Sequence, residues 1–235
     1  VMRLLDKRPS DGEGAVINLT GGTKIMMLAA FAHAMRRKVR FVYLESEQPP
    51  QHLHSFTFGN TGIAQTVENL PTLITTDDYL RAHLIGYHCE GYSREADGAL
   101  TNGGRFEQAV HQALEQHFDT LSGVRPAGVG EQIEIDLVIR HGNQVAIAEV
   151  KLGRGEEGPK KGIDQLSTAG GREYLGTYTR KLLITAGYLG ARIQALAQEK
   201  QVTTLQVDRY QDGLPLRASS AQRLVQQVKE AVGTA

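Results

Sequence analysis

Two β-rich runs separated by a short turn constrain the fold of this chain more than any other feature. Residues 132–140 and 144–152 are rich in Ile, Val, Leu and Ala, and His141-Gly142-Asn143 lies between them. Strand-forming residues on both sides of a short glycine-containing turn are typical of a β-hairpin. We therefore predict that the two runs pair as antiparallel strands.

The charged residues of this hairpin fall at matching places on its two strands. Because side chains alternate across a strand, Glu149 and Lys151 share one face, and Glu134 and Asp136 share a face of the preceding strand. Asp136 and Glu149 come at nearly the same distance from the turn, so we expect them to lie opposite each other. The hairpin then brings two carboxylates and a lysine together.

Two carboxylates beside a lysine on a half-buried sheet are costly unless a cation or a substrate compensates their charge. Mg²⁺ provides such compensation, because it binds through one or two carboxylates plus waters and phosphate oxygens. The metal would polarise a scissile phosphate, and Lys151 would orient the attacking water or neutralise developing charge. The pattern predicts phosphodiester hydrolysis by Asp136, Glu149 and Lys151 with Mg²⁺ or Mn²⁺. The alternative is an ordinary solvent-facing hairpin with a surface Glu-x-Lys.

Helices and strands alternate through the rest of the second half. Apolar residues recur at helical spacing over residues 105–118, which predicts an amphipathic helix. After a glycine- and lysine-rich loop at residues 153–162, we expect helices from Ile163, at 191–199 and at 221–232, and strands at 181–185 and 204–207. This order of elements describes an α/β sandwich.

The first half begins with a strand, a glycine turn and a helix. Residues 15–19 are apolar, Thr20-Gly21-Gly22-Thr23 follows, and residues 25–37 are rich in Ala, Met and Leu. With a second β-rich run at residues 40–44, this predicts a β-α-β unit with a parallel strand pair. Backbone N–H groups at such a turn could bind an anion. The turn matches neither a Walker A loop nor Gly-x-Gly-x-x-Gly, and the alternative is a turn without a ligand.

The stretch between the two halves is expected to be a connector and a small helical linker. Residues 46–75 contain three prolines, and Thr76 is expected to begin a helix. Glycine and polar residues gather again at residues 91–104, which favours a domain boundary near residue 100. One β-α-β unit cannot close a sheet, and the chain begins with Val1, so we expect partner strands from upstream sequence or from another chain.

The composition limits where and how the chain works. Lys plus Arg and Asp plus Glu number 26 each, which excludes the global basic charge of a protein that coats nucleic acid. The single cysteine, Cys89, excludes an intramolecular disulfide and a cysteine-rich zinc site, which favours a reducing, cytoplasmic location. The longest apolar run, residues 25–32, is too short to span a membrane, so we expect a soluble protein.

The hairpin residues resemble the core of the PD-(D/E)xK nuclease superfamily. The similarity rests on Glu134-Ile135-Asp136 followed by Ala148-Glu149-Val150-Lys151, although Ile135 takes the place of the usual proline. It implies that Asp136, Glu149 and the carbonyl of Val150 hold the metal. It also implies that Glu107, from the preceding helix, contacts a metal-bound water and that Gln165 lies beside the site.

The glycine turn resembles the signature of CRISPR-associated Rossmann-fold (CARF) sensor domains, in particular those joined by a small helical linker to a PD-(D/E)xK nuclease. The similarity rests on Asn18-Leu19-Thr20-Gly21-Gly22-Thr23-Lys24-Ile25-Met26. It implies that a cyclic oligoadenylate, most simply cyclic tetra-adenylate, binds across a homodimer interface and activates the nuclease. The implied ligand contacts are Thr20, Gly21, Gly22, Thr23 and Lys24.

The resemblance divides the chain into three parts and leaves three functions open. Residues 1–60 would be the C-terminal part of a partial Rossmann-like CARF domain, 61–100 the helical linker and 101–235 the α/β nuclease domain. The leading hypothesis is a gated nuclease of type III CRISPR defence that cleaves DNA, with RNA as a further substrate. The alternatives are an ungated nuclease of repair or restriction type, and a ligand-binding regulatory module whose nuclease-like domain is inactive.

Overall fold

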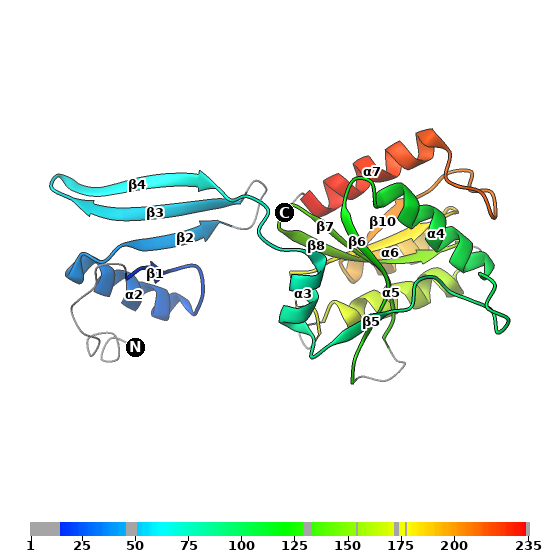
Figure 1. The fold of residues 1–235 in the computed structure, drawn as a ribbon, viewed down its shortest axis with the longest axis horizontal. Coiled ribbons are helices and arrows are strands. Elements are labelled where there is room, and N and C mark those ends of the chain that lie inside the picture. Colours follow the sequence, from blue (N-terminus) through cyan, green and yellow to red (C-terminus); the bar gives the residue numbers. More distant parts are fainter. Residues whose placement is uncertain are drawn as a thin grey trace. The chain divides into compact units, whose positions relative to one another are not determined.

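The chain folds into two compact units, each with its own sheet (Figure 1). The computed structural model describes residues 15–45, 51–128, 133–153, 155–171, 174–176 and 178–233. Described residues up to Thr72 form the first unit, and those from Leu73 form the second. Each unit mixes helices and strands, so the predicted α/β fold class is confirmed.

The first unit is a four-stranded sheet that packs against one helix. Its elements are β1 (Ile17–Asn18), α2 (Lys24–Arg37), β2 (Phe41–Glu45), β3 (His52–Gly59) and β4 (Gly62–Asn69), in the sheet order β1-β2-β3-β4. Strands β1 and β2 are parallel and are joined through α2, as the sequence predicts for residues 15–45. The other neighbouring strands are antiparallel.

The hairpin of β3 and β4 corrects the expectation of a connector over residues 46–75. The two strands pair along their full length, from His52 with Asn69 to Gly59 with Gly62. Pro71 follows the end of β4 and so does not interrupt the hairpin, while Pro49 and Pro50 lie outside the described residues. Residues 62–69 are therefore strand and not part of a helical linker.

The core of the first unit is small. Leu19, Ala34 and Phe41 are its buried apolar residues, and the ring of Phe41 stacks on that of Phe56 with centroids 4.6 Å apart. On α2, by contrast, Ile25 is 80% exposed and Leu28 is 60% exposed. One face of α2 thus covers the sheet, while large apolar side chains remain on its outer surface.

The second unit is a six-stranded sheet with helices on both faces (Figure 1). The sheet order is β10-β9-β8-β7-β6-β5, antiparallel from β5 to β8 and parallel from β8 to β10. The elements are α3 (Thr76–His83), β5 (Tyr87–Cys89), α4 (Asn102–Leu114), β6 (Asp119–Pro126), β7 (Ile135–His141), β8 (Gln144–Lys151), α5 (Glu157–Ala169), β9 (Arg180–Thr185), α6 (Ala191–Glu199), β10 (Thr203–Gln206) and α7 (Ala218–Gly233).

Two apolar clusters fill the space between this sheet and its helices. Side chains of α4 and α7 pack on one face, and side chains of α3, α5 and α6 pack on the other. The central strands β7, β8 and β9 are buried on both faces, which explains why their sequences are nearly continuous apolar runs. A polar residue on these strands therefore lies in the interior of the unit.

Several elements differ from the sequence expectations. Helix α5 begins at Glu157 and not at Ile163, so much of the expected glycine- and lysine-rich loop is helical. Strands β5 and β6 were not expected, because β6 contains Gly123 and ends at Pro126, which are weak strand formers. Strand β5 falls inside the expected linker at residues 61–100 but belongs to the sheet of the second unit. The functional division into sensor, linker and nuclease stays a prediction.

None of the helices in the described part of the chain has the length and hydropathy needed to cross a membrane.

Candidate active site

The β7–β8 hairpin carries the charged residues that the sequence singles out. Its pairing runs from His141 with Gln144 to Leu137 with Ala148, and one further step along both strands brings Asp136 opposite Glu149. The predicted arrangement of the two carboxylates thus agrees with the register of the hairpin. Lys151 lies two residues beyond Glu149, at the end of β8.

Lys151 binds both carboxylates at once. Its Nζ donates to Asp136 Oδ2 at 2.9 Å and to Glu149 Oε2 at 2.6 Å. Asp136 Oδ2 also accepts a hydrogen bond of 2.7 Å from the backbone N–H of Val150. Asp136 is 7% exposed and Glu149 only 1% exposed, so the cluster lies inside the unit and is not an ordinary surface ion pair. We call Asp136, Glu149 and Lys151 the charged cluster.

The surroundings of the cluster shift the pKa values of Glu149 and Lys151. Burial raises the pKa of Glu149 well above its ordinary value, and the nearby charge of Asp136 raises it further. Burial alone would lower the pKa of Lys151, but the charges of Asp136 and Glu149 outweigh burial and raise that pKa. One lysine compensates two buried carboxylates only in part, so the cluster favours an additional proton or cation.

Glu107 on α4 belongs to the same electrostatic environment but has a different direct partner. It is 5% exposed, and its two carboxylate oxygens accept hydrogen bonds of 2.9 Å from the backbone N–H and from the hydroxyl of Ser93. Burial raises the pKa of Glu107, and the charge of Asp136 adds to this effect. Ser93 was not among the predicted site residues, because nothing in its loop sequence indicates which helix it contacts.

Gln165 lies on α5, the helix that packs on β8. The packing is close at Gly162, where an added Cβ would lie 3.4 Å from the Glu149 Cβ and 3.5 Å from the Lys151 Cε. Gln165 follows one helical turn later, and its Oε1 is buried without a hydrogen-bond partner among the described residues. Its side chain lines a cavity of about 180 Å³ on this side of the sheet.

The residues of the charged cluster fit a divalent metal of the Mg²⁺ type. Carboxylate and carbonyl oxygens are the ligands that Mg²⁺ and Mn²⁺ prefer, and Asp136, Glu149 and the backbone of Val150 supply these atom types. Within the described residues, no three His, Cys, Asp or Glu side chains lie close enough to form a metal cage. Mg²⁺ keeps several waters and takes only one or two protein carboxylates.

The glycine turn of the first unit leads directly into α2. Thr23 is the N-cap, and its hydroxyl accepts a hydrogen bond of 3.3 Å from the N–H of Met26. Thr20 instead anchors the turn to the sheet, because its hydroxyl accepts a hydrogen bond of 2.7 Å from the N–H of Leu44. Gly22 has φ +95°, a conformation that favours glycine. All five predicted contacts, Thr20 to Lys24, are exposed at the start of a 14-residue helix.

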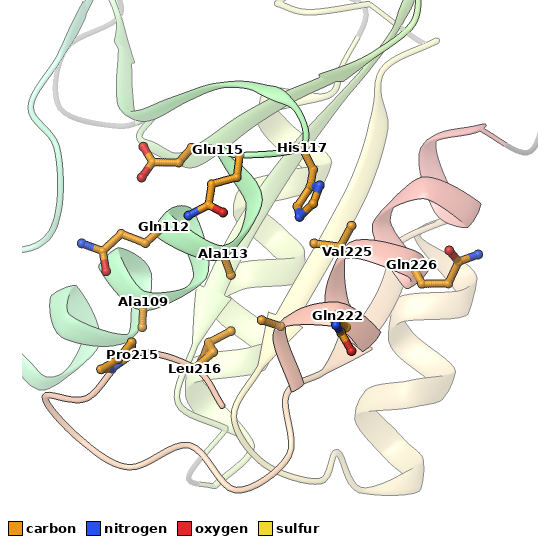
Figure 2. A pocket seen from close by; sticks show the side chains of 12 residues that line it. Ala109, Gln112, Ala113, Glu115, His117, Pro215, Leu216, Gln222, Val225 and Gln226 are labelled. Carbon is orange, nitrogen blue, oxygen red and sulfur yellow. The ribbon is translucent and has the colours of Figure 1, made fainter. Parts of the chain in front are cut away.

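A groove of about 500 Å³ lies between α4 and α7 (Figure 2). Its lining residues are Ala109, Gln112, Ala113, Glu115, Gln116, His117, Pro215, Leu216, Ala221, Gln222, Val225 and Gln226. None of the predicted site residues lines it. Glu107 is also on α4, but its contact with Ser93 and its burial place it apart from this groove.

The fold and the charged cluster together define an α/β protein with a small sheet unit and a larger unit that buries two carboxylates beside a lysine. The sequence matches no protein-family model and none of the curated proteins. Solved structures of similar fold are nevertheless found, and they allow the fold to be compared over nearly the whole chain.

Can2 from Sulfobacillus thermosulfidooxidans, in complex with cyclic tetra-adenylate, is similar with a TM-score of 0.69 and 16% sequence identity, over 98% of this chain and 80% of Can2. The protein VC1899 from Vibrio cholerae is similar with a TM-score of 0.64 and 15% identity, over 99% of this chain and 80% of VC1899. A type III CRISPR defence DNA nuclease activated by cyclic oligoadenylate gives a TM-score of 0.51 and 16% identity, over 93% of this chain and 36% of that one. The resemblance predicted from the motifs is confirmed at the level of the fold.

Proposed function

We propose that this chain is a metal-dependent nuclease that hydrolyses phosphodiester bonds in DNA, with RNA as a further substrate. The observation that carries the proposal is the charged cluster, in which Lys151 contacts both Asp136 and Glu149 in the interior of the second unit. An inactive regulatory module would have no need to keep two buried carboxylates together, because their burial costs free energy without a cation or substrate.

Asp136, Glu149 and the carbonyl of Val150 would hold the metal in this proposal. When bound, the metal supplies Lewis-acid polarisation of the scissile phosphate and a more acidic bound water. The N–H of Val150 donates a hydrogen bond to Asp136, so the orientation of this carboxylate is fixed before a substrate binds. Lys151 holds both carboxylates together and carries a positive charge that can stabilise the negative charge developing on a phosphate oxygen.

Glu107 and Gln165 have supporting roles in the proposal. Glu107 contributes negative charge near Asp136 and is oriented by Ser93, which suits a residue that contacts a metal-bound water. Gln165 lies on the helix that packs over Glu149 and Lys151, with a buried acceptor that is free to bind a group of the substrate. Both are positioning residues, since neither shares a direct hydrogen bond with the charged cluster among those described.

We further propose that a cyclic oligoadenylate activates the nuclease in type III CRISPR defence. Support comes from the exposed turn at Thr20 to Lys24, where the N-terminus of α2 favours an anionic ligand such as a phosphate. Further support is that Can2, which is similar in fold, was solved with cyclic tetra-adenylate. In this proposal the ligand binds across a homodimer. An ungated nuclease of repair or restriction type is the second candidate, because the charged cluster by itself does not require a sensor.

The test measures cleavage of plasmid and single-stranded DNA with Mg²⁺ or Mn²⁺, in the presence and absence of cyclic tetra-adenylate. Glu149→Gln and Lys151→Ala are compared with Glu199→Gln and Lys200→Ala, which change exposed residues of the same unit. We expect cleavage by the wild type and by the two controls only. Cleavage that survives both substitutions at the charged cluster would refute the site. Cleavage that ignores the cyclic nucleotide would favour the ungated nuclease.

A further inference from the structure

A second cavity lies beside the charged cluster, and one of its lining residues, Gln165, takes part in the chemistry proposed above. Its volume is about 180 Å³, and its lining residues are Ile133, Glu134, Lys161, Asp164, Gln165 and Thr168. Residues 161, 164, 165 and 168 form one stripe along α5, and the other wall is the chain that leads into β7. Small-molecule sites usually measure about 300–1,000 Å³, so this cavity suits one flat ring system and not a larger ligand.

Both walls of the cavity connect directly to the charged cluster. Glu134 precedes Asp136 by two residues, and Lys161 precedes Gly162, the residue that packs against Glu149 and Lys151. A nucleotide whose phosphate lay at the charged cluster would therefore have its neighbouring base within reach of this cavity. Helix α5 packs against β8 at Gly162, where an added Cβ would lie 3.4 Å from the Glu149 Cβ, so this wall of the cavity lies against the cluster.

The charges lining the cavity nearly cancel. Lys161 and Asp164 carry opposite charges, and Glu134 Oε2 accepts a hydrogen bond of 2.8 Å from Arg125 Nη2, which compensates its charge. A phosphate needs net positive charge or converging N–H groups, so it is a poor match for this lining. A neutral group with several hydrogen-bonding atoms is a better match.

The polar atoms of the cavity include more acceptors than donors. Gln165 Oε1 is buried without a partner among the described residues, and Asp164 adds a carboxylate. The hydroxyl of Thr168 already donates to the backbone carbonyl of Asp164 at 3.0 Å, so its oxygen acts toward a ligand as a hydrogen-bond acceptor. Buried acceptors are normally satisfied, so a ligand that donates N–H groups would complete this site. Exocyclic amines of adenine, cytosine and guanine are such donors, whereas thymine has none; Gln accepts from adenine, and Asp or Glu from cytosine.

We propose that this cavity binds a single unpaired base with an exocyclic amine, namely adenine, cytosine or guanine, next to the phosphodiester bond that is cut. The inference rests on the proposed nuclease function and adds to it a base preference against thymine. A base in a duplex would have to leave its stack to enter the cavity, which costs a few kcal/mol and disfavours paired substrates.

The first test measures binding by fluorescence anisotropy and does not depend on cleavage. The full chain carrying Glu149→Gln is titrated, with Mg²⁺ present, into labelled oligothymidine with or without one central dA, dC or dG. We expect the substituted strands to bind about tenfold more tightly than pure oligothymidine. Adding Gln165→Leu or Asp164→Leu, which remove an acceptor, should remove this difference, while adding Lys160→Ala, a neighbouring exposed lysine outside the cavity, should keep it.

The second test maps the cleavage sites of the wild type and of Asp164→Leu on single-stranded DNA of random sequence. We expect the wild type to favour dA, dC or dG over dT at one fixed position beside the cut, and Asp164→Leu, which changes a cavity residue without a role in the proposed chemistry, to cut without that preference. Equal binding of all strands, together with cuts at every base alike, would overturn the base pocket and leave the nuclease intact. A base-dependent affinity that Gln165→Leu removes, in a chain that never cuts, would support the pocket and refute the nuclease.

Discussion

The two units of this chain differ in how completely their own described residues bury them. In the second unit, helices cover both faces of the sheet, and residues such as Leu182 have no exposed surface. In the first unit, one helix covers one face, and leucines such as Leu28 remain largely exposed. Chemistry that depends on desolvated charges is therefore possible in the second unit, whereas the first unit offers an open loop and an apolar surface.

The largest effect should come from a matched pair of leucine substitutions. Leu182→Ala leaves a cavity in a closed core and should lower the free energy of unfolding by about 2–5 kcal/mol. Leu28→Ala removes a side chain that is 60% exposed and should change it by less than about 0.5 kcal/mol. Chemical denaturation of the full chain measures both. A loss at Leu28 as large as that at Leu182 would mean that another surface covers α2 in solution, and the contrast between the units would not hold.

The next effect concerns the activity of the second unit. Lys151→Ala removes the group that holds Asp136 and Glu149 together, and we expect cleavage to slow by about a hundredfold to a thousandfold. Lys200→Ala is the control, since Lys200 is exposed at the end of α6. The rate is measured in single-turnover assays with saturating metal. If both variants cut at the wild-type rate, Lys151 has only a structural role.

A smaller effect is expected in the glycine turn of the first unit. Gly22→Ala places a side chain at φ +95° and should destabilise this unit by about 1–2 kcal/mol, with weaker binding of cyclic tetra-adenylate. Gly21→Ala is the matched control for stability only, because an added Cβ there meets no atom within 4 Å, whereas Gly21 is itself a predicted ligand contact. Thermal unfolding measures stability, and calorimetric titration measures binding. An equal loss of stability for both variants would show that the positive φ of Gly22 does not limit this turn.

The smallest effect is a change in how stability depends on pH. The folded-state pKa of Glu107 is raised above its ordinary value of 4.5, so the folded chain holds this proton more tightly than the unfolded chain. Its contribution to stability is present below the ordinary pKa and is lost as the pH rises through the raised pKa. Glu107→Gln, which can still accept from the N–H of Ser93, should make the free energy of unfolding fall less steeply with rising pH across the acidic range. If the free energy of unfolding of the variant depends on pH as it does in the wild type, the raised pKa of Glu107 is refuted.

The sequence predicts the charged cluster well because strand geometry is regular near a tight turn. The two-residue side-chain period and the distance from Gly142 suffice to bring Asp136 opposite Glu149. The same rule fails farther from the turn. Ile135 packs in the cluster with α5 and α6, whereas Leu137 packs in the cluster with α4 and α7, although simple alternation assigns both to one face.

Other features depend on contacts between distant parts of the chain. An added Cβ at Gly123 would lie 2.1 Å from the carbonyl oxygen of Gly91, and one at Gly104 would lie 2.0 Å from that of Ser93. These glycines look like strand and helix breakers in the sequence, yet they allow close packing of the segment that orients Glu107. No local pattern indicates such contacts, and for this reason β6 and the role of Ser93 were not predicted.

The hydrogen bond from the Val150 N–H to Asp136 has a practical consequence for the study of this site. An asparagine at position 136 can accept that hydrogen bond through its amide oxygen, and its amide nitrogen can donate to Glu149, whose carboxyl already interacts with Asp136. Asp136→Asn therefore keeps the hydrogen bonds of the hairpin and removes one negative charge from the interior. A crystal structure of this variant would show the hairpin in its native geometry with one buried charge fewer to compensate.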